Sequence, residues 1–318
     1  MKIDNSIKYL LILFVATIIT FSILVPNIFW SLANFQSMAS QIPTLGILTL
    51  AMAITMLTGG INLSIIATMN ACSLVLAYYV TQQDSISYLT IGILFAVFCA
   101  ILIGMLNGFL IAFIKVSPIL ATLGTMTLIN GLNILMSNGS TIANFPESIL
   151  SVNSVTLLSI PLPMIILITV AVLAWFLFEK TTLGKSIYFI GNNEKATYYS
   201  GINTNKSIIF VYVISAILCF IAAILMMSKL NSAKASYGDS YLLTSILATV
   251  LGGINPDGGK GKIIGIIIAL ILLQIIESGL NMLGVSSYIT VMLWGALLIF
   301  FIFLQKIKFS HLLSLFKS

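Results

Sequence analysis

The chain has 318 residues, of which 59% are hydrophobic and only 7% are charged, and its mean hydropathy is +1.15. A soluble domain carries about 25% charged residues, so this composition excludes a soluble fold and indicates a membrane protein. The net charge is +6, but the basic residues are all lysines spread over several loops. Nucleic-acid-binding proteins gather such residues in one patch, so no nucleic-acid partner is expected.

The apolar runs are continuous and rich in Leu, Ile and Ala, whereas the strands of a membrane barrel would alternate. A membrane-spanning helix needs about 20 apolar residues, so the length allows about ten helices with short loops. We therefore predict an all-α, polytopic membrane protein with some broken or short helices, in which residues 1–318 form a single transmembrane domain.

The first apolar run is interpreted as an uncleaved span, because it continues to Trp30 and is longer than the core of a signal peptide. The eighth run is too short to cross easily, so it is expected to be a short or broken helix. Polar loops are expected at 138–159, 229–240 and 255–262. In chain order, the predicted spans are 8–30, 35–57, 61–80, 86–114, 118–137, 160–178, 207–227, 241–253, 263–283 and 287–304.

The lysines predict the orientation of these spans. With the N-terminus inside and ten crossings, only Lys229 and Lys234 of the 14 lysines face outward. This positive-inside bias predicts that both termini and the polar segment 179–206 are cytoplasmic. The lysines on the inner side are Lys2, Lys8, Lys115, Lys180, Lys185, Lys195, Lys206, Lys260, Lys262, Lys306, Lys308 and Lys317.

Segment 179–206 is the longest polar run, and we predict a helix of about two turns at 194–200 within it. Asn192 or Asn193 provides an N-cap, Glu194 suits the positive end of a helix, and Gly201 is a suitable residue directly after its end.

The helix at 194–200 presents two neighbouring tyrosines, Tyr198 and Tyr199, and tyrosine is favoured at protein interfaces. The loop 180–206 therefore either docks another protein or simply connects two parts of the bundle. It does not bind nucleotide itself: Gly184-Lys185-Ser186 ends like a phosphate-binding loop, but Glu179 stands where that motif requires its first glycine.

Two groups of polar residues fall inside or beside predicted spans. Gln274, Glu277 and Asn281 share one helix face by their spacing, and Glu277 is the only carboxylate well inside a span. They form either the wall of a substrate path or a hydrogen-bonding face between helices; Glu277 could also reach the interface.

The second group surrounds a helix break at Thr58-Gly59-Gly60. Broken helices often direct polar groups at a transported substrate, although a tight turn between helices is the alternative. Neutral hydrogen-bonding side chains suit a hydroxylated neutral solute and would equally hold helices together. The candidates in this group are Asn62, Ser64, Asn107, Thr122 and Asn130.

The three cysteines all lie in apolar spans, which favours simple packing over a disulfide or a metal site. The sequence contains no evident nucleophile–base pair, metal-ligand set or cofactor motif, so neither catalysis, a metal nor a cofactor is expected.

Several blocks of this sequence resemble the permease subunits of bacterial ATP-binding-cassette (ABC) importers for simple sugars, the ribose-type family. Residues 57–64 (LTGGINLS) are similar to the family's L-T-G-G-I-D-L-S block, and 191–202 (GNNEKATYYSGI) are similar to its cytoplasmic coupling segment. The remaining blocks are Asn107-Gly108, 118–131 (PILATLGTMTLING), 250–253 (VLGG) and 279–285 (GLNMLGV).

The resemblance implies a multi-pass protein of the bacterial plasma membrane that lacks an ATPase site of its own. It implies a second permease subunit, cytoplasmic ATPase subunits and an extracytoplasmic substrate-binding protein as partners. Membrane lipid would surround the protein. Docking of the ATPase would fall on the coupling helix, at Asn193, Glu194, Lys195, Ala196, Tyr198, Tyr199 and Gly201.

The sequence departs from the family pattern at three positions. Asn62 stands where the family usually has Asp, and Lys195 and Thr197 replace a common Glu and Ala. The expected solute is a ribose-like sugar; a nucleoside, a polyol or a furanosyl signal is the alternative within the family. An ion-coupled secondary carrier is the alternative from another class, and would transport without ATP.

Overall fold

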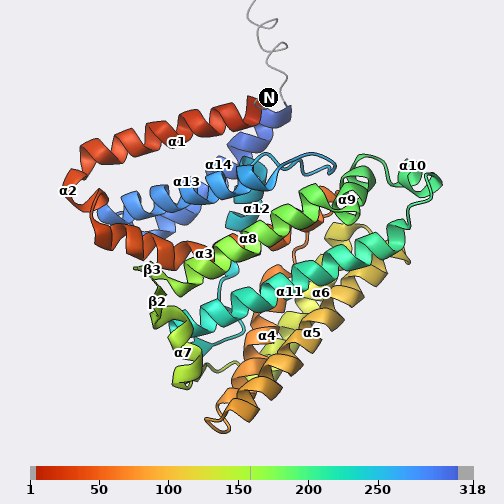
Figure 1. Cartoon of the computed structure of the whole chain (residues 1–318), viewed down its shortest axis with the longest axis horizontal. Helices are drawn as coiled ribbons and strands as arrows, with labels where there is room; N and C mark the ends of the chain where they lie inside the picture. The colour runs from red at the N-terminus through yellow and green to blue at the C-terminus, as the bar shows by residue number, and fades with distance from the viewer. Residues whose placement is uncertain (1–4, 158, 307–318) are drawn as a thin grey trace, which may run out of the picture.

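The computed structural model describes residues 5–157 and 159–306, and most of them are helical (Figure 1). The helices are α1 (Asn5–Leu24), α2 (Pro26–Phe29), α3 (Leu32–Leu57), α4 (Ile65–Val80), α5 (Ile86–Ala112), α6 (Pro118–Ser137), α7 (Glu147–Ser154), α8 (Leu162–Lys180), α9 (Thr182–Asn192), α10 (Glu194–Tyr199), α11 (Thr204–Leu230), α12 (Asp239–Leu251), α13 (Ile263–Met282) and α14 (Ser287–Lys306). Four two-residue strands pair antiparallel: β1 (Ile142–Ala143) with β4 (Ser232–Ala233), and β2 (Thr156–Leu157) with β3 (Ile160–Pro161).

Within the described residues, six helices are long and apolar enough to cross a membrane: α3, α5, α6, α8, α11 and α13. Shorter apolar stretches lie in α1, α4, α12 and α14. Each predicted span thus corresponds to one of these helices, and the span predicted at 118–137 matches α6 at both ends. Pro118 fixes the first turn of α6, and Asn138 ends the helix in a left-handed conformation.

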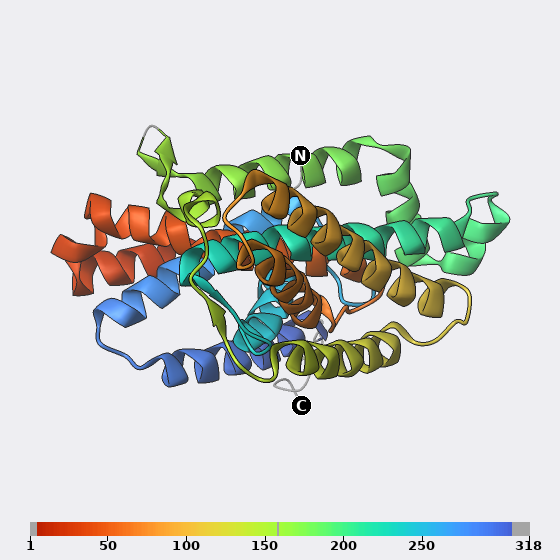
Figure 2. The same cartoon turned by 90° about the horizontal axis from the view of Figure 1, so that it is seen from below.

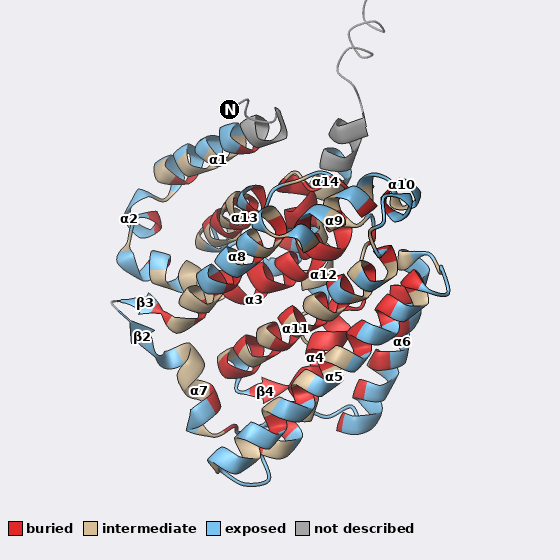
Figure 3. Ribbon diagram, turned by 45° about the vertical axis from the view of Figure 1, so that its right-hand side comes forward, coloured by how far each residue is buried: buried red, intermediate tan, exposed pale blue. Residues whose placement is uncertain are grey.

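Helix α3 lies at the centre of the molecule, where almost all of its second half is buried (Figure 3). It packs against α8, α11, α12 and α13, and α11 in turn packs closely against α5. This second half is largely apolar on all sides, which is the pattern of a helix surrounded by others. By contrast, α5, α6 and α8 leave many large apolar side chains exposed, as lipid-facing helices do.

Two predicted spans were wrong in their extent. The first does not continue unbroken to Trp30, because α1 ends at Leu24 and Pro26, which has no backbone N–H to donate, begins the separate helix α2. The third does not begin at residue 61, because residues 58–64 form turns and irregular backbone before α4 starts at Ile65.

The loops gather at two ends of the helical body. Helices α9 and α10 lie at one end, and α7 with the β2–β3 hairpin lies at the other, in both views (Figures 1 and 2). The predicted loop at 138–159 is more ordered than expected. Asn231 Oδ1 accepts a hydrogen bond from the Phe145 N–H at 2.9 Å, and Ser228 Oγ accepts one from the Asn153 N–H at 2.8 Å.

Candidate functional site

Four of the eight predicted path residues meet where α3 breaks before α4. Asn62 Oδ1 accepts from the Ser64 hydroxyl at 2.7 Å and from the Ser64 N–H at 3.1 Å. Asn107 on α5 donates from Nδ2 to Ser64 Oγ at 2.9 Å. Asn62 donates from Nδ2 to Ser215 on α11 at 3.2 Å. We call Asn62, Ser64, Asn107, Thr122 and Ser215 the break cluster.

Thr122 ties the broken segment to α6. Its Oγ1 accepts from the Leu63 N–H at 3.1 Å and lies 2.8 Å from the Pro118 carbonyl. Ser215 donates to the Ala51 carbonyl at 2.9 Å, which connects α11 to α3. All five members of the break cluster are buried, with exposed fractions of 3% or less. Apart from Asn107 Oδ1, their side-chain polar atoms are hydrogen-bonded, as an apolar bundle requires because unpaired groups are costly there.

Two members of the other predicted group, Glu277 and Asn281, line a separate cavity of about 180 Å³ between α12, α13 and α14. We call it the α12–α14 cavity. Glu277 and Asn281 are not fully buried there. The wall also contains hydroxyl groups and the buried ring of Trp294. The polar groups that join the two predicted residues are Ser240, Tyr241, Thr244, Ser287 and Thr290.

The remaining two predicted path residues lie apart from both places. Gln274 shares the helix of Glu277 but is buried, and its Nε2 lies 3.4 Å from Gln41 Oε1 on α3. Asn130 is half-buried on α6, one turn from the buried Asn133. The structure therefore divides the predicted path into a buried cluster, an open cavity and two separate residues.

The predicted coupling helix exists as α10, Glu194–Tyr199, one residue shorter than expected. Asn193 is its N-cap, and Asn193 Oδ1 accepts from the Ala196 N–H at 3.0 Å. Gly201 follows the helix with a φ of +85°, a conformation that favours glycine. Both predicted features of this helix, the cap and the terminating glycine, are confirmed.

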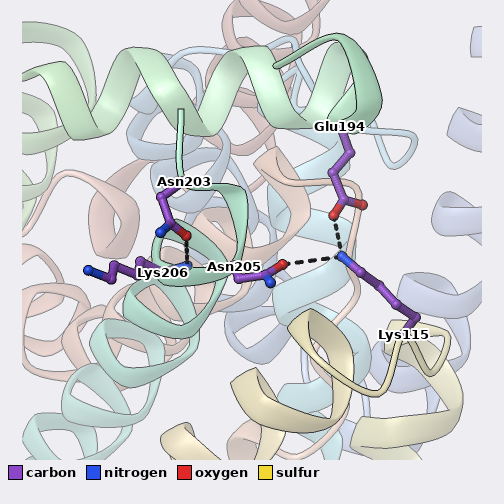
Figure 4. A network of polar contacts seen from close by, with 5 residues as sticks. All are labelled: Lys115, Glu194, Asn203, Asn205 and Lys206. Atoms are coloured by element: carbon purple, nitrogen blue, oxygen red, sulfur yellow. Dashed lines mark hydrogen bonds and ion pairs between the residues drawn. The ribbon is translucent and has the colours of Figure 1, made fainter. Parts of the chain in front are cut away.

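A polar network fixes α10 against two neighbouring segments (Figure 4). Lys115, in the turn between α5 and α6, forms an ion pair with Glu194 Oε1 at 2.7 Å and donates to Asn205 Oδ1 at 3.3 Å. Tyr198 and Tyr199 are exposed, at 62% and 85%, and their rings contact each other edge-on at 5.9 Å. Beside them lies a hollow of about 610 Å³ that is also lined by Lys195 and Thr204.

Helix α9 is a feature that the sequence interpretation missed. The segment before Asn193 was expected to be loop, but residues 182–192 form an amphipathic helix that buries Ile187 and Ile190. Thr181 provides its N-cap by accepting from the Gly184 N–H at 3.2 Å. The Gly184-Lys185-Ser186 sequence therefore lies in a regular helix.

The glycine- and lysine-rich loop 255–262 joins α9 to the end of α3. Asn192 donates to the Gly259 carbonyl at 3.2 Å, and the Gly259 N–H donates to the Leu57 carbonyl at 2.9 Å. A Cβ added at Gly191 would overlap both the Leu57 oxygen and the Gly259 nitrogen. Three segments that are distant in the sequence thus approach each other through their backbones.

Tyr188 on α9 makes a further bond to this loop. Its hydroxyl donates to the Gly261 carbonyl at 3.0 Å. Burial, with a smaller contribution from the nearby Glu179 carboxylate, raises the pKa of Tyr188 to about 12. The hydroxyl therefore stays protonated, and able to donate, throughout the physiological pH range.

Comparison with known proteins assigns the chain to a family. Residues 34–302 match the family described as the permease component of a branched-chain amino acid transport system. The chain belongs to this permease family. The permease thus matches the family along almost its whole length, from α3 to α14.

Relatives of the permease include import proteins for two kinds of solute. It is 33% identical to the ribose import permease protein RbsC of Bacillus subtilis over 299 residues, which cover 93% of this chain and 91% of the relative. It is 34% identical to the autoinducer 2 import system permease protein LsrD of Photorhabdus temperata over 261 residues, 80% of this chain and 78% of that protein. The LsrD protein of Escherichia coli K12 is 33% identical over the same length. No solved structure matches the permease.

Some structural residues of the permease were not among the predicted ones. Ser215 was missed because it is a lone hydroxyl in the apolar run of α11, with no local pattern around it. Asn70 on α4 donates to the Ala235 carbonyl at 2.8 Å and to the Tyr237 carbonyl at 3.0 Å, which ties α4 to the segment before α12. In the part of the chain that the structure describes, no group of three or more His, Cys, Asp or Glu residues could hold a metal ion.

Proposed function

We propose that the chain is the membrane-spanning subunit of an ATP-driven importer that passes a ribose-like sugar from an extracytoplasmic binding protein into the cytoplasm. The observation that carries the proposal is the match to import permeases along nearly the whole chain, including the segment that forms α10. The permease would hydrolyse no ATP itself and would transmit the motion of separate ATPase subunits.

The proposed topology has ten crossings: α1, α3, α4, α5, α6, α8, α11, α12, α13 and α14. Both termini and the α9–α10 end would face the cytoplasm. The lysines at that end support this orientation, since Lys229 and Lys234 belong to the opposite end of α11 and the loop after it. Lys2, Lys308 and Lys317, which contribute to the same count, lie outside the described residues.

The proposed ATPase-docking surface is α10 with its caps. The exposed rings of Tyr198 and Tyr199 would enter a cleft of the ATPase, and the hollow beside them would receive a side chain from it. Lys195 is exposed and would face the partner, so an ATPase surface with acidic groups is expected there. Asn193, Glu194, Ala196 and Gly201 would hold the helix in place.

The proposed path uses the two groups of polar residues at different times. In the described conformation the break-cluster groups bond mainly to one another, so they would meet solute only after the broken segment moves. Glu277 and Asn281 would contact it from the α12–α14 cavity, where hydroxyls and an indole ring are also present. Gln274 and Asn130, which lie apart from both places in the described conformation, would be further polar contacts along the path.

The names of these relatives indicate two solutes, ribose and autoinducer 2. The chemistry of the α12–α14 cavity favours a small solute with several hydroxyl groups, because most of its polar side chains are neutral donors and acceptors. We take the ribose-like sugar as the first candidate, since the match to the ribose permease covers more of both chains. A nucleoside or polyol remains a further candidate for the same site.

The proposal also requires a second permease subunit, because the resemblance implies paired subunits around one path.

The decisive experiment places the permease and its ATPase in lipid vesicles, with the binding protein outside, and measures uptake of labelled ribose. ATP-dependent uptake is expected. Uptake that continues without ATP and stops when an ion gradient is abolished would establish a secondary carrier instead.

Docking is tested separately. Deleting residues 193–201, or replacing Gly201 by Val, should abolish co-purification of the ATPase while membrane insertion remains intact, because β-branched side chains do not tolerate a φ of +85°. The matched control is Gly139→Val, which has a similar φ of +68° and open space around it but lies at the opposite end. Normal co-purification of the ATPase with both the 193–201 deletion and the Gly201→Val variant would refute the docking surface.

A further inference from the structure

An apolar cavity of about 320 Å³ lies between α3, α8 and α13, and it shares no lining residue with the α12–α14 cavity. It is lined by the buried Ile42 on α3, by Ala171 on α8 and by Ile267 on α13. Val172 and Ile264 at its rim are more than half exposed. Because α8 and α13 are both long and apolar enough to cross a membrane, the exposed rim of the cavity would face the hydrocarbon of a bilayer.

One end of this cavity carries charged groups. Trp175 lines the cavity, and its indole N–H donates to Glu179 Oε2 at 3.0 Å. The Lys180 ammonium lies 5.3 Å from the centre of the Trp175 ring. Lys262 is the residue before Ile263, which begins α13 and also lines the cavity. Tryptophan and lysine together are typical of the level where lipid head groups meet hydrocarbon.

We propose that this cavity binds one acyl chain of a phospholipid from the leaflet on the α9 side, with the lipid phosphate held between Lys180 and Lys262. The apolar lining accepts the chain, and the two ammonium groups attract the phosphate. Glu179 offsets one of the two lysines, so Lys180, Lys262 and Glu179 together carry a net charge of +1. A head group with a single phosphodiester matches that charge, so we take phosphatidylglycerol as the occupant.

The lipid would also brace the α9 side of the molecule. Glu179, which holds Trp175, is near enough to Tyr188 to raise the pKa of that phenol, and Tyr188 bonds to Gly261 beside Lys262. The head group would therefore bridge the C-terminal end of α8 and the N-terminal end of α13, which the loop 255–262 and α9 also connect.

The test titrates palmitoyl-oleoyl phosphatidylglycerol onto the delipidated full-length protein in mild detergent and counts retained lipids by native mass spectrometry. One lipid should bind more tightly than the rest. Lys180→Gln together with Lys262→Gln should weaken that binding at least about fivefold, because each lysine near a membrane surface attracts anionic lipid. Ala171→Phe should weaken it independently by filling the cavity.

The matched control is Lys206→Gln together with Lys234→Gln, which removes the same charge from positions outside the cavity and should leave the tight lipid in place. Circular dichroism and gel filtration verify that each variant is folded. Equal loss of lipid in both lysine pairs would overturn the proposal. A folded Ala171→Phe variant that keeps the lipid would also overturn it. If that variant keeps the lipid but no longer forms a dimer, the cavity would belong to an interface with a second copy of the chain.

Discussion

The break cluster and the α12–α14 cavity are both polar places in an apolar bundle, yet their side chains behave differently. In the break cluster, Asn62 and Ser64 bond to each other and to neighbouring helices, and both are buried. In the α12–α14 cavity, Glu277 and Asn281 face an open space. One arrangement fixes a helix break, whereas the other leaves hydrogen-bonding capacity for another molecule.

The difference shows that polarity inside a span does not by itself indicate a substrate contact. A buried amide in a membrane protein needs partners, and the nearest partners are usually on adjacent helices. In the break cluster only Asn107 Oδ1 lacks a partner among the described residues. Variants that separate stability from transport should therefore distinguish the two places.

The largest loss of stability is expected for Asn62→Leu. It removes the acceptor of Ser64 and the donor to Ser215, and each buried polar group left unpaired costs about 1–3 kcal/mol. Thermal unfolding in a fixed detergent should show a clearly lower midpoint, with little correctly folded protein in the membrane. A stable Asn62→Leu protein that has lost only transport would identify Asn62 as a solute contact instead.

Asn62→Asp should be milder. The Asp side chain still accepts from the hydroxyl and N–H of Ser64, but it loses the donor to Ser215 and buries a carboxyl group without a cationic partner, so we expect a destabilisation of about 1–3 kcal/mol. The same unfolding measurement checks it, with Asn133→Asp as a second buried amide for comparison. If Asp destabilises as much as Leu does, the retained acceptor for Ser64 does not offset the lost bond to Ser215 and the buried carboxyl group.

Asn281→Ala should change transport without changing stability. The side chain is exposed, and loss of one hydrogen bond to solute corresponds to about 1 kcal/mol, or roughly a fivefold rise in KM. Uptake in vesicles with ATPase and binding protein gives the KM, and the unfolding midpoint should match the unmodified protein. An unchanged KM together with a lower midpoint would place Asn281 with the structural residues.

The smallest effect is expected for Glu277→Gln, which keeps the shape and the acceptor oxygen of the side chain. If Glu277 forms only a polar wall, the rate of uptake should stay within about twofold of the unmodified protein, because no charge is needed to bond a neutral sugar. Complete loss of uptake in a folded protein would instead show that the charge takes part in transport.

The extent to which the sequence predicted this structure depended on how local each signal is. The span at 118–137 and the helix at 194–199 follow from proline, asparagine and glycine signals within the segments themselves. Helix α9 was missed because polar residues lie along much of it and its apolar stripe contains only a few residues, such as Ile187 and Ile190. These two side chains are buried by other segments, which the local sequence does not show. The short strand pair β1–β4 joins residues 142–143 to 232–233, and no local pattern indicates such a distant pairing.

The sequence predicted which residue types make up the candidate site, but not that they separate into the break cluster and the α12–α14 cavity. The glycine break and its Asn62 could be recognised from sequence, whereas its partners lie on α5, α6 and α11 and are brought together only by packing. The i, i+3, i+7 spacing of Gln274, Glu277 and Asn281 was correct as a helix face. That face nevertheless has two environments, because Gln274 meets α3 and the other two meet the cavity.

The backbone contact of Gly191 with Leu57 and Gly259 restricts how this protein can be recombined with its relatives. The three residues come from α9, the end of α3 and the loop 255–262, and no side chain separates them. A chimaera that takes α9 and α10 from another permease, in order to recruit a different ATPase, must also take residues 255–262. Without them, helix α9 from the donor would contact the main chain of a loop from a different protein. Their separation is too short for a side chain to lie between them.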